Sequence, residues 1–213
     1  HLLTALPIPL IPFIRDEFAL DYTQSGVVIA VFSMAYGVSN IPAGWFADRL
    51  GTLILLTTGI VGVALAGILV GFSQTYAMML ASLVLMGVLA GGYHPSAPAL
   101  VAASVSPEKR GRALGFHLIG GSTSYFVTPL IAATTAVAWG WRSSFVLLAI
   151  PVMIFGILFY FLLKRYIVTG KSGDRVISAD VKTPAESHHV RGLISVLVVS
   201  NISMATICSV ISF

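Results

Sequence analysis

Long apolar runs alternate with short polar breaks along the 213 residues of this chain. Five runs contain no charged residue and are each long enough to cross a bilayer core, which needs about 20 residues of helix. They lie at residues 23–43, 53–72, 76–103, 113–137 and 143–163. A shorter run precedes them at 4–14, and another follows at 192–213. The pattern predicts an all-α, polytopic membrane protein with six helices, a break, and the start of a seventh.

The same pattern predicts three segments. Residues 1–163 are expected to form a six-helix transmembrane bundle, 164–191 a polar cytoplasmic linker, and 192–213 the seventh helix, which begins a second bundle. Run 4–14 is too short to span a bilayer, so we expect the first helix to be truncated and the chain to be a fragment. Six helices followed by a break indicate one half of a twelve-helix protein.

Composition places this chain in a bilayer, since 57% of its residues are hydrophobic, 9% are charged and its mean hydropathy is +0.94. The net charge of +4 does not indicate a nucleic-acid partner, because the basic residues lie in the breaks between runs rather than on one solvated face. Ten of the twelve Lys and Arg residues fall in alternate breaks, and only Arg15 and Arg142 fall in the others. The positive-inside rule therefore predicts a multi-pass protein of the cell membrane with a cytoplasmic linker.

The most informative break reads Gly44-x-x-Ala47-Asp48-Arg49-x-Gly51. A charged pair between two glycines, in a short turn between membrane helices, is suited to helix packing and conformational switching. This break resembles the loop between helices two and three of the major facilitator superfamily. In that family the aspartate, which Asp48 matches, helps to hold the two halves together on the cytoplasmic side.

This chain departs from the family pattern at three positions in that loop. Phe46 stands where leucine is usual, and Thr52 and Leu53 replace a basic pair, so the cytoplasmic charge network is thinner here. Residues 106–116, which include Arg112, are similar to the family's connection between helices four and five. The resemblance thus covers nearly the whole chain. Within the family, short segments such as Tyr93-His94-Pro95 look nearest to the fosmidomycin-resistance-like carriers.

The run at 113–137 has the spacing of the family's antiporter motif in Ser124-x-x-x-Thr128-Pro129-x-x-Ala132-Ala133, with other small residues at the glycine positions. Small residues at these positions still allow a neighbouring helix to come close, and Pro129 permits a bend in its own helix. Two interpretations stay open: an antiporter signal, or a proline kink in a tightly packed helix.

His94 is the best candidate for chemistry in the spans. Gly87, Gly91, His94 and Pro98 recur at helical spacing and so share one face. The five full-length runs contain no Asp, Glu, Lys or Arg, and an imidazole at membrane depth is costly unless it faces a cavity or a partner. His94 therefore either binds substrate or carries a proton, or it is a neutral histidine bonded between packed helices.

Further site residues follow from the resemblance, in which helices one, four and seven surround a central cavity beside helices two and five. It implies substrate contacts at Tyr36, Asn40, Tyr93, His94 and Tyr125. His117 is interpreted instead as an interfacial anchor, as are the tryptophans at the span ends, Trp45, Trp139 and Trp141. His1, which precedes the Pro-rich run, is a candidate inner-cavity residue that the truncated first helix leaves unplaced.

These observations predict a secondary active transporter that moves a small solute by alternating access, coupled to protons, with efflux or antiport favoured. The alternative is a receptor or sensor that binds a solute without moving it. An enzyme is not expected, because the chain has no phosphate-binding loop and its spans hold only isolated histidines. We expect no metal and no cofactor. The expected partners are the bilayer, an anionic or neutral solute, and the C-terminal half of the same protein.

Overall fold

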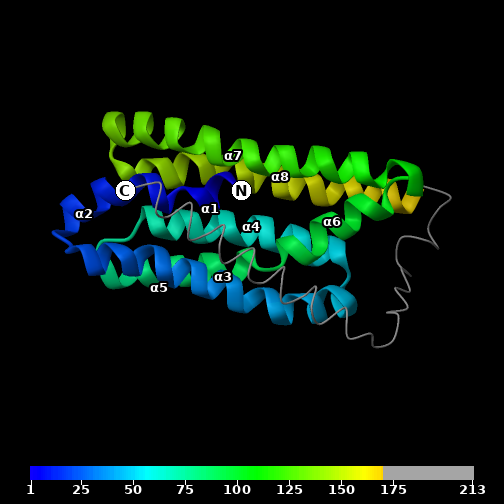
Figure 1. The fold of residues 1–213 in the computed structure, drawn as a ribbon, viewed down its shortest axis with the longest axis horizontal. Coiled ribbons are helices and arrows are strands. Elements are labelled where there is room, and N and C mark those ends of the chain that lie inside the picture. The colour runs from blue at the N-terminus through cyan, green and yellow to red at the C-terminus, as the bar shows by residue number, and fades with distance from the viewer. Residues whose placement is uncertain (170–213) are drawn as a thin grey trace. The chain divides into compact units, whose positions relative to one another are not determined.

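The computed structural model describes residues 1–169, which form α-helices joined by short turns (Figure 1). The elements are α1 (Leu2–Ala5), α2 (Pro7–Phe18), α3 (Tyr22–Leu50), α4 (Thr52–Gly71), α5 (Tyr76–Ala90), α6 (Tyr93–Ala103), a 3-10 turn (Pro107–Lys109), α7 (Arg110–Trp139) and α8 (Trp141–Thr169). No strand occurs within the described range, and the predicted all-α class is confirmed. α8 continues beyond the predicted bundle boundary at residue 163, while most of the predicted linker and all of the predicted seventh helix lie outside the described residues.

Two of the predicted helices are each interrupted by a short turn. Between α1 and α2, Pro7 has no N–H to donate, and the Leu6 N–H bonds instead to the Leu3 carbonyl at 3.3 Å. Between α5 and α6, the Gly91 N–H bonds to the Val88 carbonyl, also at 3.3 Å, and both linking glycines keep right-handed helical angles. The predicted run at 76–103 is therefore two helices with a tightened turn between them.

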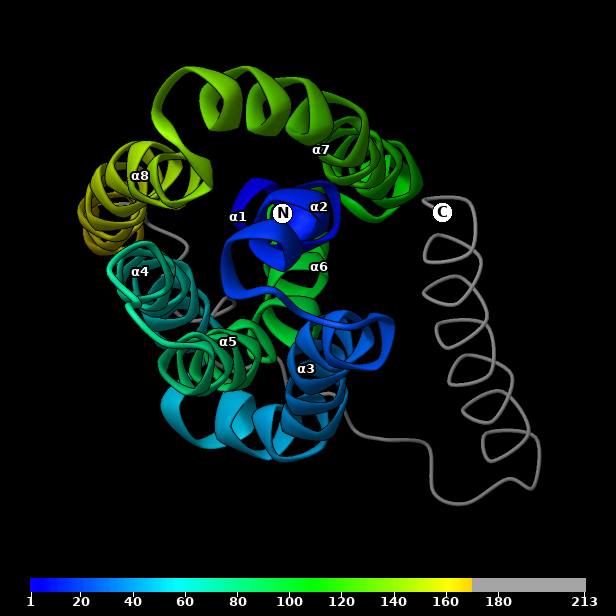
Figure 2. The same ribbon diagram turned by 90° about the vertical axis from the view of Figure 1, so that its left-hand side faces the viewer.

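α4 packs between α5 and α8, while α3 packs on α5 and α7 on α8. Figure 2 shows these five helices as an arc around α1, α2 and α6. The apolar side chains of α1 and α2 fill the centre of the arc, so Leu6, Leu10 and Ile14 are buried. Glycine brings α5 close to α3, because a Cβ on Gly87 would lie 2.6 Å from the Phe32 carbonyl oxygen.

Four helical segments in the described range are long and apolar enough to cross a membrane: Tyr22–Leu50, Thr52–Gly71, Tyr76–Ala103 and Trp141–Arg165. The predicted run at 113–137 is helical within α7 but is not among the four. Its glycine, serine and threonine residues make it less apolar than the others. α7 stays helical through Pro129, and its ribbon curves in Figure 2.

Candidate functional site

A cavity of about 410 Å³ opens among α1, α3, α4, α6, α7, α8 and the end of α5. Its polar lining comes from residues of four helices or their ends, and apolar side chains and glycines complete the wall. The polar lining residues are His1, Thr4, Tyr36, Tyr93, His117 and Ser124. An apolar pocket with a few convergent polar groups is the usual form of a small-molecule site.

Rings from three helices and His1 meet at this cavity. The Tyr93 ring lies 4.9 Å from that of His1 and 5.8 Å from that of His94, measured between centroids. His94 also lies 5.8 Å from His1 and 5.7 Å from Tyr36 of α3. Tyr93 and His94 are the first two residues of α6, so the turn at Gly91 and Gly92 places both rings at the cavity.

Close packing holds that turn in place. A Cβ on Gly92 would lie 2.9 Å from Cγ of Leu55 in α4, so α4 leaves no room for a larger residue without a shift. Gly87 and Gly91 both face α3, as does His94 through Tyr36. The face predicted from the spacing of these residues thus persists across the interruption between α5 and α6.

The predicted substrate-contact residues divide into two groups. Tyr36 and Tyr93 line the cavity, and His94 lies beside it in contact with both rings. Tyr125 is 55% exposed and outside the lining, although its ring centroid is 6.1 Å from that of His1. Asn40 donates its side-chain amide to the Tyr36 carbonyl at 2.7 Å, a bond within its own helix.

His117 is a site residue that the sequence interpretation missed. Its imidazole lines the cavity and stacks on Tyr93, with centroids 5.9 Å apart and planes inclined by 20°. The interpretation of His117 as an interfacial anchor is therefore replaced by a position in the cavity wall. The helical spacing of His117, Gly121 and Ser124, which share one face of α7, is the signal that could have revealed it.

The small-residue motif of α7 faces the first helices. Thr128 is fully buried, and its hydroxyl donates to the Leu2 carbonyl at 3.4 Å. Ala132 is also fully buried, whereas Ser124 lines the cavity one turn earlier. The motif thus packs α7 against α1 and α2, and Pro129, the predicted bend, is exposed between these contacts.

The charged break that dominates the sequence is not a loop. α3 runs to Leu50, α4 begins at Thr52, and Gly51 alone connects them, so Asp48 and Arg49 lie in the last helical turn. Gly51 has φ of +86°, a conformation that favours glycine. The Arg49 guanidinium lies over the Trp45 ring at 4.0 Å. The prediction of a polar turn from Gly44 onward is thus wrong in extent, since the helix continues through it.

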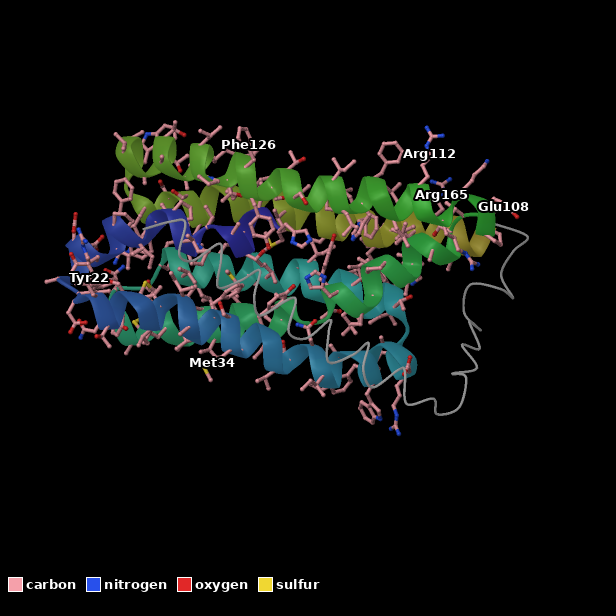
Figure 3. The ribbon with its side chains drawn as sticks, in the orientation of Figure 1. Tyr22, Met34, Glu108, Arg112, Phe126 and Arg165 are labelled. Atoms are coloured by element: carbon pink, nitrogen blue, oxygen red, sulfur yellow. The ribbon has the colours of Figure 1, made fainter. Side chains whose placement is uncertain are left out.

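The charged ends of the helices lie where the alternating breaks predict. Figure 3 shows Glu108, Arg112 and Arg165 at one end of the described unit and Tyr22 at the other. The connection between α3 and α4 is also at the end that holds Arg112 (Figure 1). Arg112 lies in the first turn of α7, where its guanidinium is 5.6 Å from the Phe116 ring.

At the opposite end, Glu17 ties α2 to the start of α8. Its carboxylate accepts hydrogen bonds from Arg142 and from the Trp141 indole N–H, the latter at 2.7 Å. Arg142 also donates to the Ser73 carbonyl at 2.9 Å, which adds the connection between α4 and α5. Partial burial raises the pKa of Glu17, but the hydrogen bonds from Arg142 and Trp141 outweigh it and hold the pKa below its usual value. Trp141 is 3% exposed, so it is a packing residue and not the interfacial anchor expected from the sequence.

Within residues 1–169, no group of three His, Cys, Asp or Glu side chains is placed to hold a metal ion. The histidines near the cavity contact aromatic rings instead.

The comparison with known families identifies the class of protein. The profile of the Major Facilitator Superfamily matches residues 1–213, and the chain belongs to this family. The predicted family and the expectation that the chain is not an enzyme are confirmed. Its apolar helices and its family together indicate an integral membrane protein. The narrower resemblance to fosmidomycin-resistance-like carriers stays a prediction.

Curated relatives carry transporter and resistance names. The multidrug resistance protein MdtG of Yersinia enterocolitica is 34% identical over 68% of this chain and 36% of its own length. The probable L-galactonate transporter of Escherichia coli is 26% identical over 71% of this chain and 34% of its own length. The probable sulfoacetate transporter SauU of Cupriavidus necator is 29% identical over 72% of this chain and 36% of its own length. The chain spans between about a third and a half of the length of such relatives.

Solved structures agree on the fold. The crystal structure of the peptide transporter POT in complex with sulfate has a TM-score of 0.69 and 19% identity, and it covers 97% of this chain and 42% of its own. The predicted half-bundle fold class is confirmed by this likeness.

Proposed function

We propose that this chain is the N-terminal part of a secondary active transporter that moves a small solute by alternating access. The observation that carries the proposal is the cavity of about 410 Å³ where rings from α3, α6 and α7 converge. A solute held there contacts three helices at once, so its binding responds to their relative movement. The C-terminal half of the same protein supplies the other wall of the site.

The solute class that fits this wall is a small organic anion or a neutral polar molecule. Tyr36, Tyr93 and Ser124 offer hydroxyls and His117 an imidazole, and no acidic side chain lines the cavity in the described part of the chain. A protonated imidazole pairs with an anion, while the tyrosine rings cover an apolar face. Two of the relatives are named as transporters of L-galactonate and of sulfoacetate, which are organic anions, and these names are in line with this class.

Proton coupling through His94 is the second element of the proposal. His94 contacts Tyr36 and Tyr93, which line the cavity, and the apolar runs contain no Asp, Glu, Lys or Arg. Histidine changes charge near neutral pH, so a proton on His94 alters the charge beside the bound solute. The antiporter spacing around Pro129 and the multidrug resistance relatives favour efflux or antiport.

We further propose that the protein lies in the cell membrane with the end that holds Arg112 and Arg165 in the cytoplasm. Six of the eight Lys and Arg residues in the described range lie at that end, because they fall in alternate breaks between the apolar runs. Asp48 and Arg49 of the last turn of α3 then face the cytoplasm, where they act with Gly44, Gly51 and Arg112 in closing the two halves.

Flux through liposomes tests the proposal. Full-length protein is reconstituted with an imposed pH gradient, and uptake or release of radiolabelled organic acids, neutral sugars and cationic drugs is measured. We expect an organic acid or a neutral solute to move in a gradient-dependent manner. Saturable binding of such a solute without any movement contradicts transport and identifies a receptor or sensor on the same scaffold.

A further inference from the structure

A second, larger hollow lies on the α4 side of the unit, between α5 and α8. Its volume is about 730 Å³, and its lining is almost entirely apolar. Figure 2 shows α5, α4 and α8 side by side in the arc. We call this hollow the α4 groove; Ile54, Thr58, Leu65, Leu85, Ile157 and Tyr160 are among its lining residues.

Glycines create the α4 groove by bringing its walls together at two points. A Cβ on Gly62 of α4 would lie 3.0 Å from a methyl of Leu89 in α5, and one on Gly156 of α8 would lie 2.9 Å from Cγ2 of Ile60. Away from these two contacts, the larger side chains of the lining leave a gap between the helices that is open to the exterior, and Leu65 is 50% exposed. All three helices belong to segments long and apolar enough to span a membrane, so the groove lies within the apolar part of the unit.

The polar groups of the groove are confined to one part of it. Thr57, Thr58 and Tyr160 line it. The Thr57 hydroxyl donates to the Leu53 carbonyl of its own helix at 2.8 Å, whereas the hydroxyls of Thr58 and Tyr160 have no hydrogen bond with another described residue. A hydroxyl without a partner at membrane depth is costly. One turn beyond Tyr160 is Lys164, whose ammonium lies 5.5 Å from the centre of the Tyr160 ring. A cation and two hydroxyls thus adjoin a long apolar groove.

The surrounding charge favours an anionic occupant. The end of the unit near Lys164 holds six basic and two acidic residues of the described chain, and the other end holds two basic and three acidic residues. From Ile54 to Leu69, α4 extends about 22 Å at 1.5 Å per residue. One leaflet of the hydrocarbon core is about 15 Å thick, so the groove is long enough for one acyl chain.

We propose that the α4 groove binds an anionic phospholipid. The acyl chain lies along Leu65, Leu85 and Ile157, and the phosphate meets Lys164 beside the hydroxyls of Tyr160 and Thr58. Basic side chains next to a cleft between membrane helices are a recognised arrangement for anionic headgroups. This site is separate from the solute cavity, with which it shares no lining residue.

Two pairs of variants of the full-length protein test the proposal in detergent. Ile157→Trp fills the groove, and its control Leu158→Trp changes the next residue, which is also exposed but lies outside the groove. Lys164→Gln removes the cation, and its control Lys109→Gln removes an exposed cation from the connection before α7. The probes are dioleoyl phosphatidylglycerol and dioleoyl phosphatidylcholine, with lipid retention counted by native mass spectrometry and stability followed by thermal melting.

We expect phosphatidylglycerol to be retained and to raise the melting temperature more than phosphatidylcholine does. Ile157→Trp should reduce retention of both lipids, and Lys164→Gln should reduce the preference for phosphatidylglycerol by about fivefold, the effect of one basic residue near a charged membrane surface. Both controls should behave as wild type. The proposal is overturned if the wild type retains the two lipids equally. It is also overturned if Ile157→Trp or Lys164→Gln changes lipid retention no more than its own control does. Stabilisation by inorganic phosphate alone, to the same extent, overturns it as well.

Discussion

His117 stacks on Tyr93 across the junction of α7 and α6, with ring centroids 5.9 Å apart. The contact joins a helix that carries the antiporter spacing to the helix that carries His94. Since His1 and His94 also touch Tyr93, this tyrosine connects the histidines of the cavity. We therefore expect the orientation of Tyr93, and not any one histidine alone, to govern solute binding.

Loss of the His117 ring should weaken solute binding. His117→Ala removes a stacked partner of Tyr93, a type of contact with a strength of about 1 kcal/mol, so the KM for solute flux should rise about fivefold. The control is Leu118→Ala, which changes a neighbouring side chain that is 67% exposed and outside the cavity lining. An unchanged KM in His117→Ala contradicts a role for the stacked pair in binding.

Removal of His94 should separate coupling from folding. His94→Ala should abolish flux driven by a pH gradient, because the proposed function places the coupled proton on this imidazole, beside the cavity-lining Tyr36 and Tyr93. His94 is exposed in the described chain, so its loss should leave the thermal stability nearly unchanged. Liposome uptake with and without a pH gradient measures the effect, and solute exchange at equal pH is the control. Unchanged gradient-driven flux makes His94 a structural residue.

The ion pair of Glu17 and Arg142 should make stability depend on pH. The pKa of Glu17 in the folded protein is lower than its usual value of 4.5, so the carboxylate contributes stability above that value and loses it as pH falls through the folded pKa. Glu17→Gln should lower the free energy of unfolding by about 1 kcal/mol at pH 7, a figure reduced for solvent screening because the side chain is partly exposed. The difference should vanish at acid pH.

Melting temperatures of wild type and Glu17→Gln at pH 7 and at pH 3.5 or below, roughly a unit under the usual carboxyl value, measure this dependence. Asp16→Asn is the matched control, since Asp16 pairs only with the adjacent Arg15 among the described residues and its side chain is 71% exposed. A Glu17→Gln deficit that stays constant across this range contradicts the ion-pair explanation.

Gly87 should tolerate no side chain. Gly87→Ala places a methyl 2.6 Å from the Phe32 carbonyl oxygen, which belongs to backbone and cannot turn aside, so α5 must move away from α3. We expect a loss of about 1–3 kcal/mol of stability, as for other overpacked cores. Gly26→Ala, in the same pair of helices, meets nothing within 4 Å and should be neutral or stabilising by up to about 1 kcal/mol. Thermal melting in detergent compares the two, and equal melting points contradict the packing argument.

Helix boundaries show where sequence reasoning is strong and where it fails. The uncharged run at 53–72 matches α4 within one residue at each end, because a run of this length without charge can only be buried in lipid or protein. The charged residues Asp48 and Arg49 ended the predicted run before them, yet α3 continues to Leu50. Backbone hydrogen bonds continue a helix through charged residues at the bilayer surface, where water solvates the side chains.

The length of the uncharged apolar runs, the alternation of charge between the breaks and the Asp48 motif by themselves determined the class of this protein: an all-α half-bundle of its family, with its basic ends on one side. Each of these depends on a property of single residues or of local segments, namely transfer free energy, chain length and charge. Only the tertiary structure decided that His117 enters the cavity, that Asn40 bonds within its own helix, that Trp141 is buried against Glu17 and that glycines open the α4 groove. These features depend on how helices distant in sequence are rotated and how closely they approach one another. Close packing sets that arrangement through many small contacts between segments, which no single segment contains.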